Sequence, residues 1–177
     1  EAWVYPTLSG ATQSQMIIGK VDDTQNGLSA DLAYAIRYGA GGFVAEVGDG
    51  TSSKGVSSGA QNVKLNQWQH VAMVFDGTTG NLSLYIDGVL QGTSLSTGYS
   101  AIKNSSSSLK FGAYSTTFGQ YFKGGLDEVR IWNVAKTQAQ IQSTMFSQLS
   151  GVQGNLVVQY NFNQGTAGAT NTSVTSL

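Results

Sequence analysis

Apolar and polar residues alternate with a period of two through most of this chain. In segment 31–39, for example, Leu32, Tyr34, Ile36 and Tyr38 lie on one side of an extended backbone. Successive side chains of a β-strand point to opposite faces, so this pattern predicts strands with one buried face. The same alternation covers 42–50, 67–77 and 81–92, and we expect further strands at 2–5, 16–21, 109–115, 122–133 and 156–162.

A single segment, near the C-terminus, has helical periodicity instead. Ile141, Met145 and Leu149 recur at every fourth position and would share one face of a helix. Thr137 and Gln140 have the spacing of a capping box, in which each side chain binds the other residue's backbone N–H. The sequence therefore predicts one short helix at about 137–149.

About ten strands and one short helix are typical of an all-β, two-sheet antiparallel sandwich. The chain has 177 residues, which suits one domain with a sizeable core. We expect the sandwich to occupy residues 1–162, with residues 163–177 as a C-terminal tail or a linker to a following domain.

The composition excludes several classes of function. Only 11% of the residues are charged and the net charge is −1, without a basic stripe. The electrostatic attraction that drives nucleic-acid binding is therefore lacking. No apolar run reaches the roughly 18 residues that a membrane helix requires, which predicts no membrane insertion. The absence of cysteine excludes disulfides, thiol catalysis and thiolate metal sites.

Two adjacent carboxylates, Asp127 and Glu128, stand out in a chain that has ten acidic residues. On a regular strand they would point to opposite faces, so the pair could not act together on one bond. A glycosidase needs two carboxylates that face the same sugar, and we therefore expect no enzyme. Glu128 is expected to pair with Arg130 on its own face. His70 is the only histidine, and the sequence has no G-x-S-x-G motif to supply a nucleophilic serine that it could activate. His70 is therefore expected to be structural.

Asp127 would share its strand face with apolar Val129 and Ile131. A carboxylate at the rim of a core needs a hydrogen-bonding, ionic or metal partner. In a chain with no thiol and one histidine, an oxygen-ligated calcium ion (Ca²⁺) is one candidate. Backbone N–H groups of a neighbouring loop are the other, and the residues leave both open.

Three motifs follow one another along the chain: "EAWVYPT" at 1–7, "NQWQHVAMVFDGTTGNLSLYIDGVLQGT" at 66–93 and "GGLDEVRIWNVAKTQAQI" at 124–141. In order and spacing they resemble the laminin G-like and pentraxin-like jelly-roll domains of the concanavalin A-like lectin/glucanase superfamily. The resemblance covers residues 1 to about 162. The ending "GNLVVQYNFNQGTAG" also resembles a strand of large surface proteins from polymer-degrading bacteria.

This resemblance implies a jelly-roll sandwich with a concave and a convex face and, usually, a non-catalytic binding or adhesion role. Glucanase relatives carry an aspartate at the position of Asp127 that helps to hold a structural calcium ion. Members also begin with a further strand, missing from this sequence, that often supplies calcium ligands. The C-terminal strand, with Asn161 and Asn163, would have to take part instead, and the metal candidates are therefore Asp127 and Asn163.

Aromatic side chains are the natural candidates for sugar binding, because their rings stack on the apolar faces of pyranoses. Polar neighbours then bind the sugar hydroxyl groups. About half of the candidates are expected to be core residues, because sandwich interiors also contain tyrosine. The candidate ligand-binding residues are Tyr34, Arg37, Tyr38, Tyr85, Tyr114 and Tyr121.

The leading hypothesis is a secreted or cell-surface module that binds a glycan or a cell-surface protein, within a larger multidomain protein. One alternative is a structural spacer in a large adhesin, which would have no aromatic cluster on an exposed face. The other is a polysaccharide-degrading enzyme of the same fold.

Overall fold

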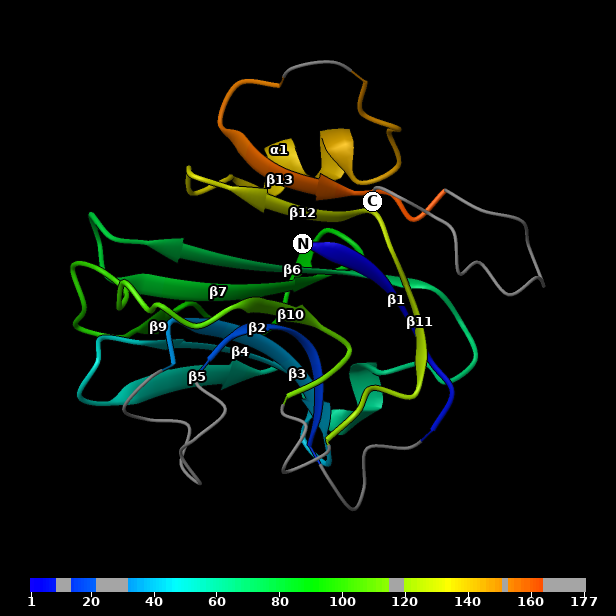
Figure 1. Ribbon diagram of the computed structural model, residues 1–177, viewed down its shortest axis with the longest axis horizontal. Helices are drawn as coiled ribbons and strands as arrows, with labels where there is room; N and C mark the ends of the chain where they lie inside the picture. The colour runs from blue at the N-terminus through cyan, green and yellow to red at the C-terminus, as the bar shows by residue number, and fades with distance from the viewer. Residues whose placement is uncertain (9–13, 22–31, 115–119, 151–152, 164–177) are drawn as a thin grey trace.

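Two antiparallel sheets stack face to face in the computed structural model (Figure 1). The structure describes residues 1–8, 14–21, 32–114, 120–150 and 153–163. Within these residues it has thirteen strands, one α-helix and one short 3₁₀ helix (η1, Ala60–Asn62). The predicted all-β jelly-roll sandwich with one short helix is confirmed.

The larger sheet has six strands in the order β11-β1-β6-β7-β8, and β9 also pairs with β7. Its strands are β1 (Ala2–Pro6), β6 (Gln69–Asp76), β7 (Asn81–Ile86), β8 (Val89–Leu90), β9 (Leu95–Ser96) and β11 (Gly124–Asp127). The smaller sheet has five strands in the order β10-β2-β3-β4-β5. Its strands are β2 (Gln15–Lys20), β3 (Tyr34–Gly39), β4 (Gly42–Gly48), β5 (Ser53–Ser57) and β10 (Leu109–Phe111).

The main core lies between the two sheets and follows from the alternation. On β1, Ala2 and Val4 are fully buried, whereas Trp3 and Tyr5 are only half-buried because they point to the opposite face. The other strands contribute alternate residues in the same way. The cluster includes Ile36, Phe43, Ala45, Val47, Val71, Leu82, Leu84, Ile86 and Val129.

A separate two-stranded ladder pairs β12 (Val129–Trp132) with β13 (Leu156–Tyr160) beside the larger sheet (Figure 1). The prediction of one continuous strand over 122–133 is wrong at Glu128, whose φ of 48° is left-handed. This residue turns the chain, so β11 stays paired with β1 while β12 pairs with β13. Leu126 and Val129 consequently both pack on the core, which regular alternation would not allow.

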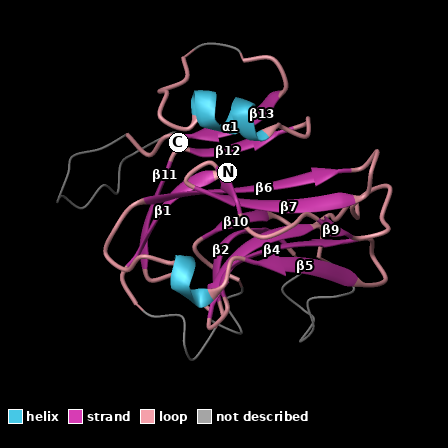
Figure 2. Cartoon of the chain, turned by 180° about the vertical axis from the view of Figure 1, so that it is seen from behind, coloured by secondary structure: helices cyan, strands magenta, loops and turns pink. Residues whose placement is uncertain are grey.

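Helix α1 (Gln138–Thr144) begins with the predicted capping box. Gln140 N–H donates to Thr137 Oγ1 at 3.3 Å, and Thr137 N–H donates to Gln140 Oε1 at 2.8 Å. Ile141 is 1% exposed and packs with Ala72 and Tyr85 on the outer face of the larger sheet. Seen from behind, the helix lies beside β12 and β13 at one side of the sandwich (Figure 2).

The helix ends at Thr144, earlier than the predicted position 149. The guanidinium of Arg130 donates to the carbonyl oxygens of Thr144 and Ser147 at 2.8 and 2.5 Å. These bonds satisfy carbonyl groups at the end of the helix that have no partner within it. Leu149 therefore lies beyond the helix and is half-buried, whereas Met145 is buried as predicted.

Two of the strands, β5 and β9, were not predicted, whereas β8 lies within the predicted segment 81–92. β5 lies at the edge of the smaller sheet and has the mostly polar sequence SKGVS, which lacks the alternation of a half-buried strand. Apart from Asn163, the predicted tail or linker falls outside the described residues. Among the described helices, none has the length and apolar character needed to cross a membrane.

Candidate functional site

The outward face of β1 and β11 carries part of an aromatic surface. Val4 belongs to the core, so Trp3 and Tyr5 on either side of it face outward. In the antiparallel pairing Asp127 lies opposite Trp3, and Gly125 lies opposite Tyr5. Side chains at directly opposite positions share a face of the sheet, so Asp127 is placed beside the two rings.

Trp68 extends this surface from the segment before β6. Its ring centroid lies 5.4 Å from that of Tyr5, with the ring planes tilted by 53°. A Cβ atom on Gly125 would come within 3.0 Å of the Trp68 ring, so glycine leaves room for the indole over β11. Trp68 is still 48% exposed, and one side of its ring is free to meet a ligand.

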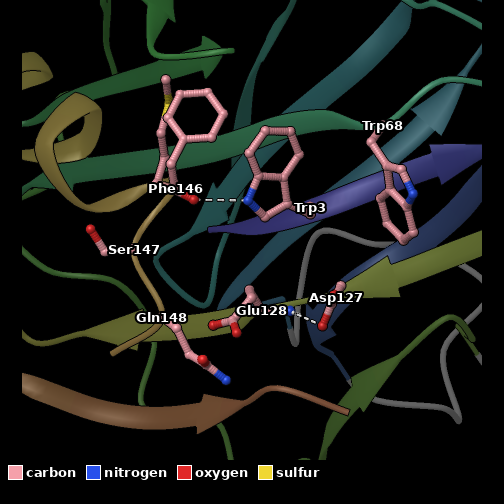
Figure 3. A pocket seen from close by; sticks show the side chains of 8 residues that line it. Trp3, Trp68, Asp127, Glu128, Phe146, Ser147 and Gln148 are labelled. Carbon is pink, nitrogen blue, oxygen red and sulfur yellow. Dashed lines mark hydrogen bonds between the residues drawn. The ribbon is translucent and has the colours of Figure 1, made fainter. Parts of the chain in front are cut away.

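The chain that follows helix α1 forms the opposite wall. Trp3 Nε1 donates to the carbonyl oxygen of Met145 at 2.8 Å, which ties this segment to β1. The next residue, Phe146, is 76% exposed, and its ring centroid lies 5.4 Å from that of Trp3. Phe146 and Trp68 thus lie on either side of Trp3 (Figure 3).

These side chains surround an open hollow of about 340 Å³ (Figure 3). Aromatic walls combined with a small number of polar groups are typical of ligand sites. The lining residues are Trp3, Trp68, Asp127, Glu128, Met145, Phe146, Ser147 and Gln148.

A buried arginine holds the Phe146 wall in position. Arg130 is 1% exposed, and its Nη2 donates to Glu128 Oε2 at 2.7 Å. This contact confirms the predicted Glu128–Arg130 pair. Because the same guanidinium binds the carbonyl oxygens of Thr144 and Ser147, it links β12 to both sides of Phe146.

Comparison with known families decides the fold family. The sequence model of a laminin G type family, described as the concanavalin A-like lectin/glucanases superfamily, matches residues 1–142. The chain belongs to this superfamily. The resemblance noted in the sequence is therefore confirmed. No curated protein matches this concanavalin A-like chain by sequence.

Several solved structures share the concanavalin A-like fold. A candidate carbohydrate binding protein from Bacteroides ovatus matches with a TM-score of 0.69 and 22% identity, over 90% of this chain and 43% of that one. Domain 4 of an extracellular arabinanase (AbnA, GH43) from Geobacillus stearothermophilus, in complex with arabinotriose, matches with a TM-score of 0.56 and 21% identity, over 80% and 63%. A heptameric SAP-like pentraxin from Limulus polyphemus matches with a TM-score of 0.54 and 19% identity, over 80% and 65%. The chain spans less than two thirds of each.

In this concanavalin A-like domain Asp127 and Glu128 line the same hollow, contrary to the sequence prediction. The prediction assumed regular alternation, which the left-handed backbone of Glu128 breaks. The geometric argument against a pair of cooperating carboxylates is therefore wrong. Glu128 is engaged by Arg130, and no catalytic role is shown for either carboxylate.

Asp127 Oδ1 accepts the backbone N–H of the next residue, Glu128, at 2.8 Å, rather than an N–H group of a neighbouring loop. The described residues contain no cluster of three or more His, Cys, Asp or Glu side chains. A cation at Asp127 would thus need amide, carbonyl or water oxygens as further ligands. Val129 pairs with Tyr160, so the segments carrying Asp127 and Asn163 leave the same end of the β12–β13 ladder. The calcium site stays a prediction.

The structure does not gather the predicted ligand-binding residues into one face. Tyr38, Tyr85 and Tyr114 are 4%, 9% and 5% exposed, and each packs in a different apolar cluster. Their rings lie inside the molecule and do not present a face to a ligand at the surface. The expectation that about half of the candidates serve the core fits this arrangement.

The other three predicted residues remain at least partly accessible but lie apart. Arg37 on β3 forms an ion pair with Glu46 on β4. Tyr34 lines a second, wider hollow of about 1330 Å³ between β6 and β12, whose wall is largely apolar. Tyr121 is 47% exposed and forms an isolated bridge with Met16, the second residue of β2.

His70 is buried beside the site and faces Trp3 edge-on, with ring centroids 5.5 Å apart. Burial lowers the pKa of His70 to about 4, and the carboxylate of Glu1, whose Oε2 lies 3.8 Å from Nε2, only partly opposes this. The ring is therefore neutral at pH 7. Its buried Nδ1 has no hydrogen-bond partner among the described residues. The expected structural role fits these surroundings.

Sequence reasoning missed Trp3, Trp68 and Phe146 as site residues. The signal for Trp3 was present, because the alternation that buries Ala2 and Val4 points it outward. Phe146 gave no such signal, since its place beside Trp3 depends on a hydrogen bond between residues 142 positions apart.

Proposed function

We propose that this domain is a non-catalytic carbohydrate-binding module whose glycan lies across the hollow between Trp68 and Phe146. The observation that carries the proposal is the solvent exposure of these two large rings on either side of Trp3. Contiguous exposed apolar groups with polar neighbours mark interaction sites in soluble proteins. Sugar rings have apolar faces that suit such a surface, and their hydroxyl groups suit the polar neighbours.

The polar part of the hollow fits hydroxyl groups. Asp127 offers carboxylate oxygens as acceptors, and the amide of Gln148 offers both a donor and an acceptor. Trp3 Nε1 is engaged by Met145, so that indole contributes its ring rather than its N–H group.

The relatives support a glycan as the ligand class. One is named as a candidate carbohydrate binding protein, and another is a domain of an extracellular arabinanase in complex with arabinotriose. We extend this to a secreted or cell-surface location and to a place within a larger adhesive or polymer-binding protein. Antibodies against the domain should then label intact cells or the culture medium, and labelling only after cell lysis would contradict this location.

The two alternatives are less well supported. A spacer domain needs no aromatic residues gathered on an exposed face, whereas the exposed Trp68 and Phe146 line one hollow together with Trp3. A glycosidase needs two carboxylates free to act on the same bond, but Glu128 is bound by Arg130. Incubation with a polysaccharide panel should release no reducing sugar. Turnover that is abolished by Asp127→Asn or Glu128→Gln would overturn the non-catalytic proposal.

The binding site can be tested with a matched set of aromatic variants. Binding is first measured on a glycan array and then by calorimetry, with arabinotriose among the probes. Trp68→Ala and Phe146→Ala should each weaken binding about tenfold, equivalent to roughly 1.4 kcal/mol. Tyr121→Ala is the control, since Tyr121 is 47% exposed, almost as much as Trp68, but does not line the hollow. Equal losses for Tyr121 and Trp68 would contradict the proposed site.

We also propose, from the sequence, that Asp127 and Asn163 contribute to a calcium ion that stabilises the fold. Calcium at about 100 times its dissociation constant would add roughly 2.7 kcal/mol to the stability. The melting temperature should rise with calcium and fall with chelator, and Asp127→Ala should remove the difference. If neither calcium nor chelator changes the melting temperature, the calcium proposal is wrong, and Asp127 only accepts a backbone hydrogen bond.

A further inference from the structure

The charged side chains that line the hollow are both negative. Two carboxylates line it, Asp127 and Glu128, and none of its eight lining residues is Lys, Arg or His. Charge at a site selects ligands by repulsion as well as by attraction. The charge balance of the hollow therefore bears on the class of sugar that it accepts.

Arg130 does not offset these charges for a ligand. It is 1% exposed, and its terminal nitrogens are committed to Glu128 Oε2 and to the carbonyl oxygens of Thr144 and Ser147. A sugar carboxylate or sulfate in the hollow could not reach this guanidinium. Because Arg130 neutralises Glu128, the charge left facing a ligand is that of Asp127.

Asp127 lies on the outward face opposite Trp3, and among the described residues no basic side chain forms an ion pair with it. A carboxylate accepts hydrogen bonds from hydroxyl groups, but it repels another anion that is brought close and partly desolvated. We propose that, with no cation bound at Asp127, the hollow selects uncharged glycans over uronic-acid or sulfated ones, and that Asp127 is the residue that sets this preference. This inference rests on the proposed carbohydrate-binding function.

The test uses an array in which each neutral oligosaccharide is paired with its C6-carboxylate form. Binding is measured in buffer with EDTA, so that Asp127 carries its own charge. The native domain should bind the neutral member of a pair about tenfold more tightly, because two like charges at a protein surface repel each other. Raising sodium chloride from about 20 mM to about 500 mM should reduce this preference, because salt screens exposed charges.

Two variants assign the effect to the hollow. Asp127→Asn should reduce the preference to about twofold or less, whereas Gln148→Glu should increase it by adding a negative charge at the rim. Asp49→Asn is the control, because it removes one negative charge from an exposed turn that does not line the hollow. Circular dichroism checks that each variant is folded. If Asp127→Asn does not fold, the change in preference caused by Gln148→Glu still tests the proposal.

The outcomes separate this inference from the function on which it rests. If the native domain binds both members of each pair equally, or if Asp127→Asn and Gln148→Glu leave the preference unchanged, the proposed selectivity is wrong. Binding to the neutral sugars would in that case still support the proposed function. If no glycan of either kind binds, the carbohydrate-binding function itself fails.

Discussion

Two arginine–glutamate pairs occupy different parts of the molecule, and their surroundings differ. Arg130 and Glu128 lie at the hollow, with side chains 1% and 16% exposed, and Arg130 also binds the carbonyl oxygens of Thr144, the last residue of helix α1, and of Ser147 beyond it. Arg37 and Glu46 lie on neighbouring strands of the smaller sheet, with side chains 17% and 10% exposed. The first pair orders a segment with no sheet partner, whereas the second joins strands β3 and β4, which are already paired.

The aromatic residues of the two regions differ in the opposite sense from the arginines, because those around the hollow are the more exposed. Around the hollow, Trp68 and Phe146 are exposed and are supported by the less exposed Trp3 and Tyr5. On the smaller sheet, Tyr38 is buried and packs against Phe43, with ring centroids 5.6 Å apart. Both regions thus contain aromatic residues. Those of the proposed binding surface are exposed and rest on neighbouring rings, whereas those of the scaffold are buried.

The largest expected effect comes from breaking the buried pair. Arg130→Met should cost about 3–5 kcal/mol in the free energy of unfolding, because Glu128 loses its ion-pair partner and the carbonyl oxygens of Thr144 and Ser147 each lose a hydrogen bond. Urea unfolding measures this cost. Arg37→Met is the matched variant, and it should cost less than half as much because Arg37 is more exposed than Arg130 and Glu46 keeps a hydrogen bond from Ser53. Equal costs would remove the distinction between the two pairs.

Helix α1 leads directly into the segment that forms one wall of the hollow, so its packing comes next. Ile141→Ala should cost about 2–4 kcal/mol, because the side chain is buried against Ala72 and Tyr85 and its removal leaves a cavity. Ser143→Ala on the exposed side of the helix is the control and should change stability by less than about 0.5 kcal/mol. A loss below that value for Ile141→Ala would mean that the helix is only loosely attached.

Acid should destabilise the hollow side of the molecule through His70. Burial lowers the pKa of His70 to about 4 from an ordinary value of 6.5, so the unfolded state binds a proton more readily than the folded state. Stability from this group is therefore fully present above pH 6.5 and is lost as the pH falls towards 4, by at most about 3 kcal/mol. Urea unfolding at several pH values should show this slope, and His70→Phe should flatten it. A slope that survives this substitution would assign the acid sensitivity to other groups.

The fold could be predicted from sequence because its causes are local. Alternation marks the strands, and the capping box of Thr137 and Gln140 marks the start of the helix. The end of the helix was misplaced because Arg130, a residue of another element, takes up the Thr144 and Ser147 carbonyl groups.

The site could not be predicted in the same way, because it depends on one backbone angle and on long-range contacts. The left-handed φ of Glu128 brings both carboxylates to one hollow, although glutamate has no special preference for that conformation. The walls of the hollow come from β1, from the segment before β6 and from the segment after α1, and only the folded chain brings these together.

The smallest expected effect tests whether the wider hollow is a second ligand site. Tyr34 lines that hollow, and burial raises the pKa of its phenol above the ordinary value of 10. Tyr34→Phe removes only the hydroxyl group, so the fold should persist and glycan affinity should change by less than about twofold, or roughly 0.4 kcal/mol. Calorimetry with the best neutral glycan of the array measures this affinity. A tenfold loss would place sugar contacts in the wider hollow, and the contrast between an exposed binding region and a buried scaffold would then no longer hold.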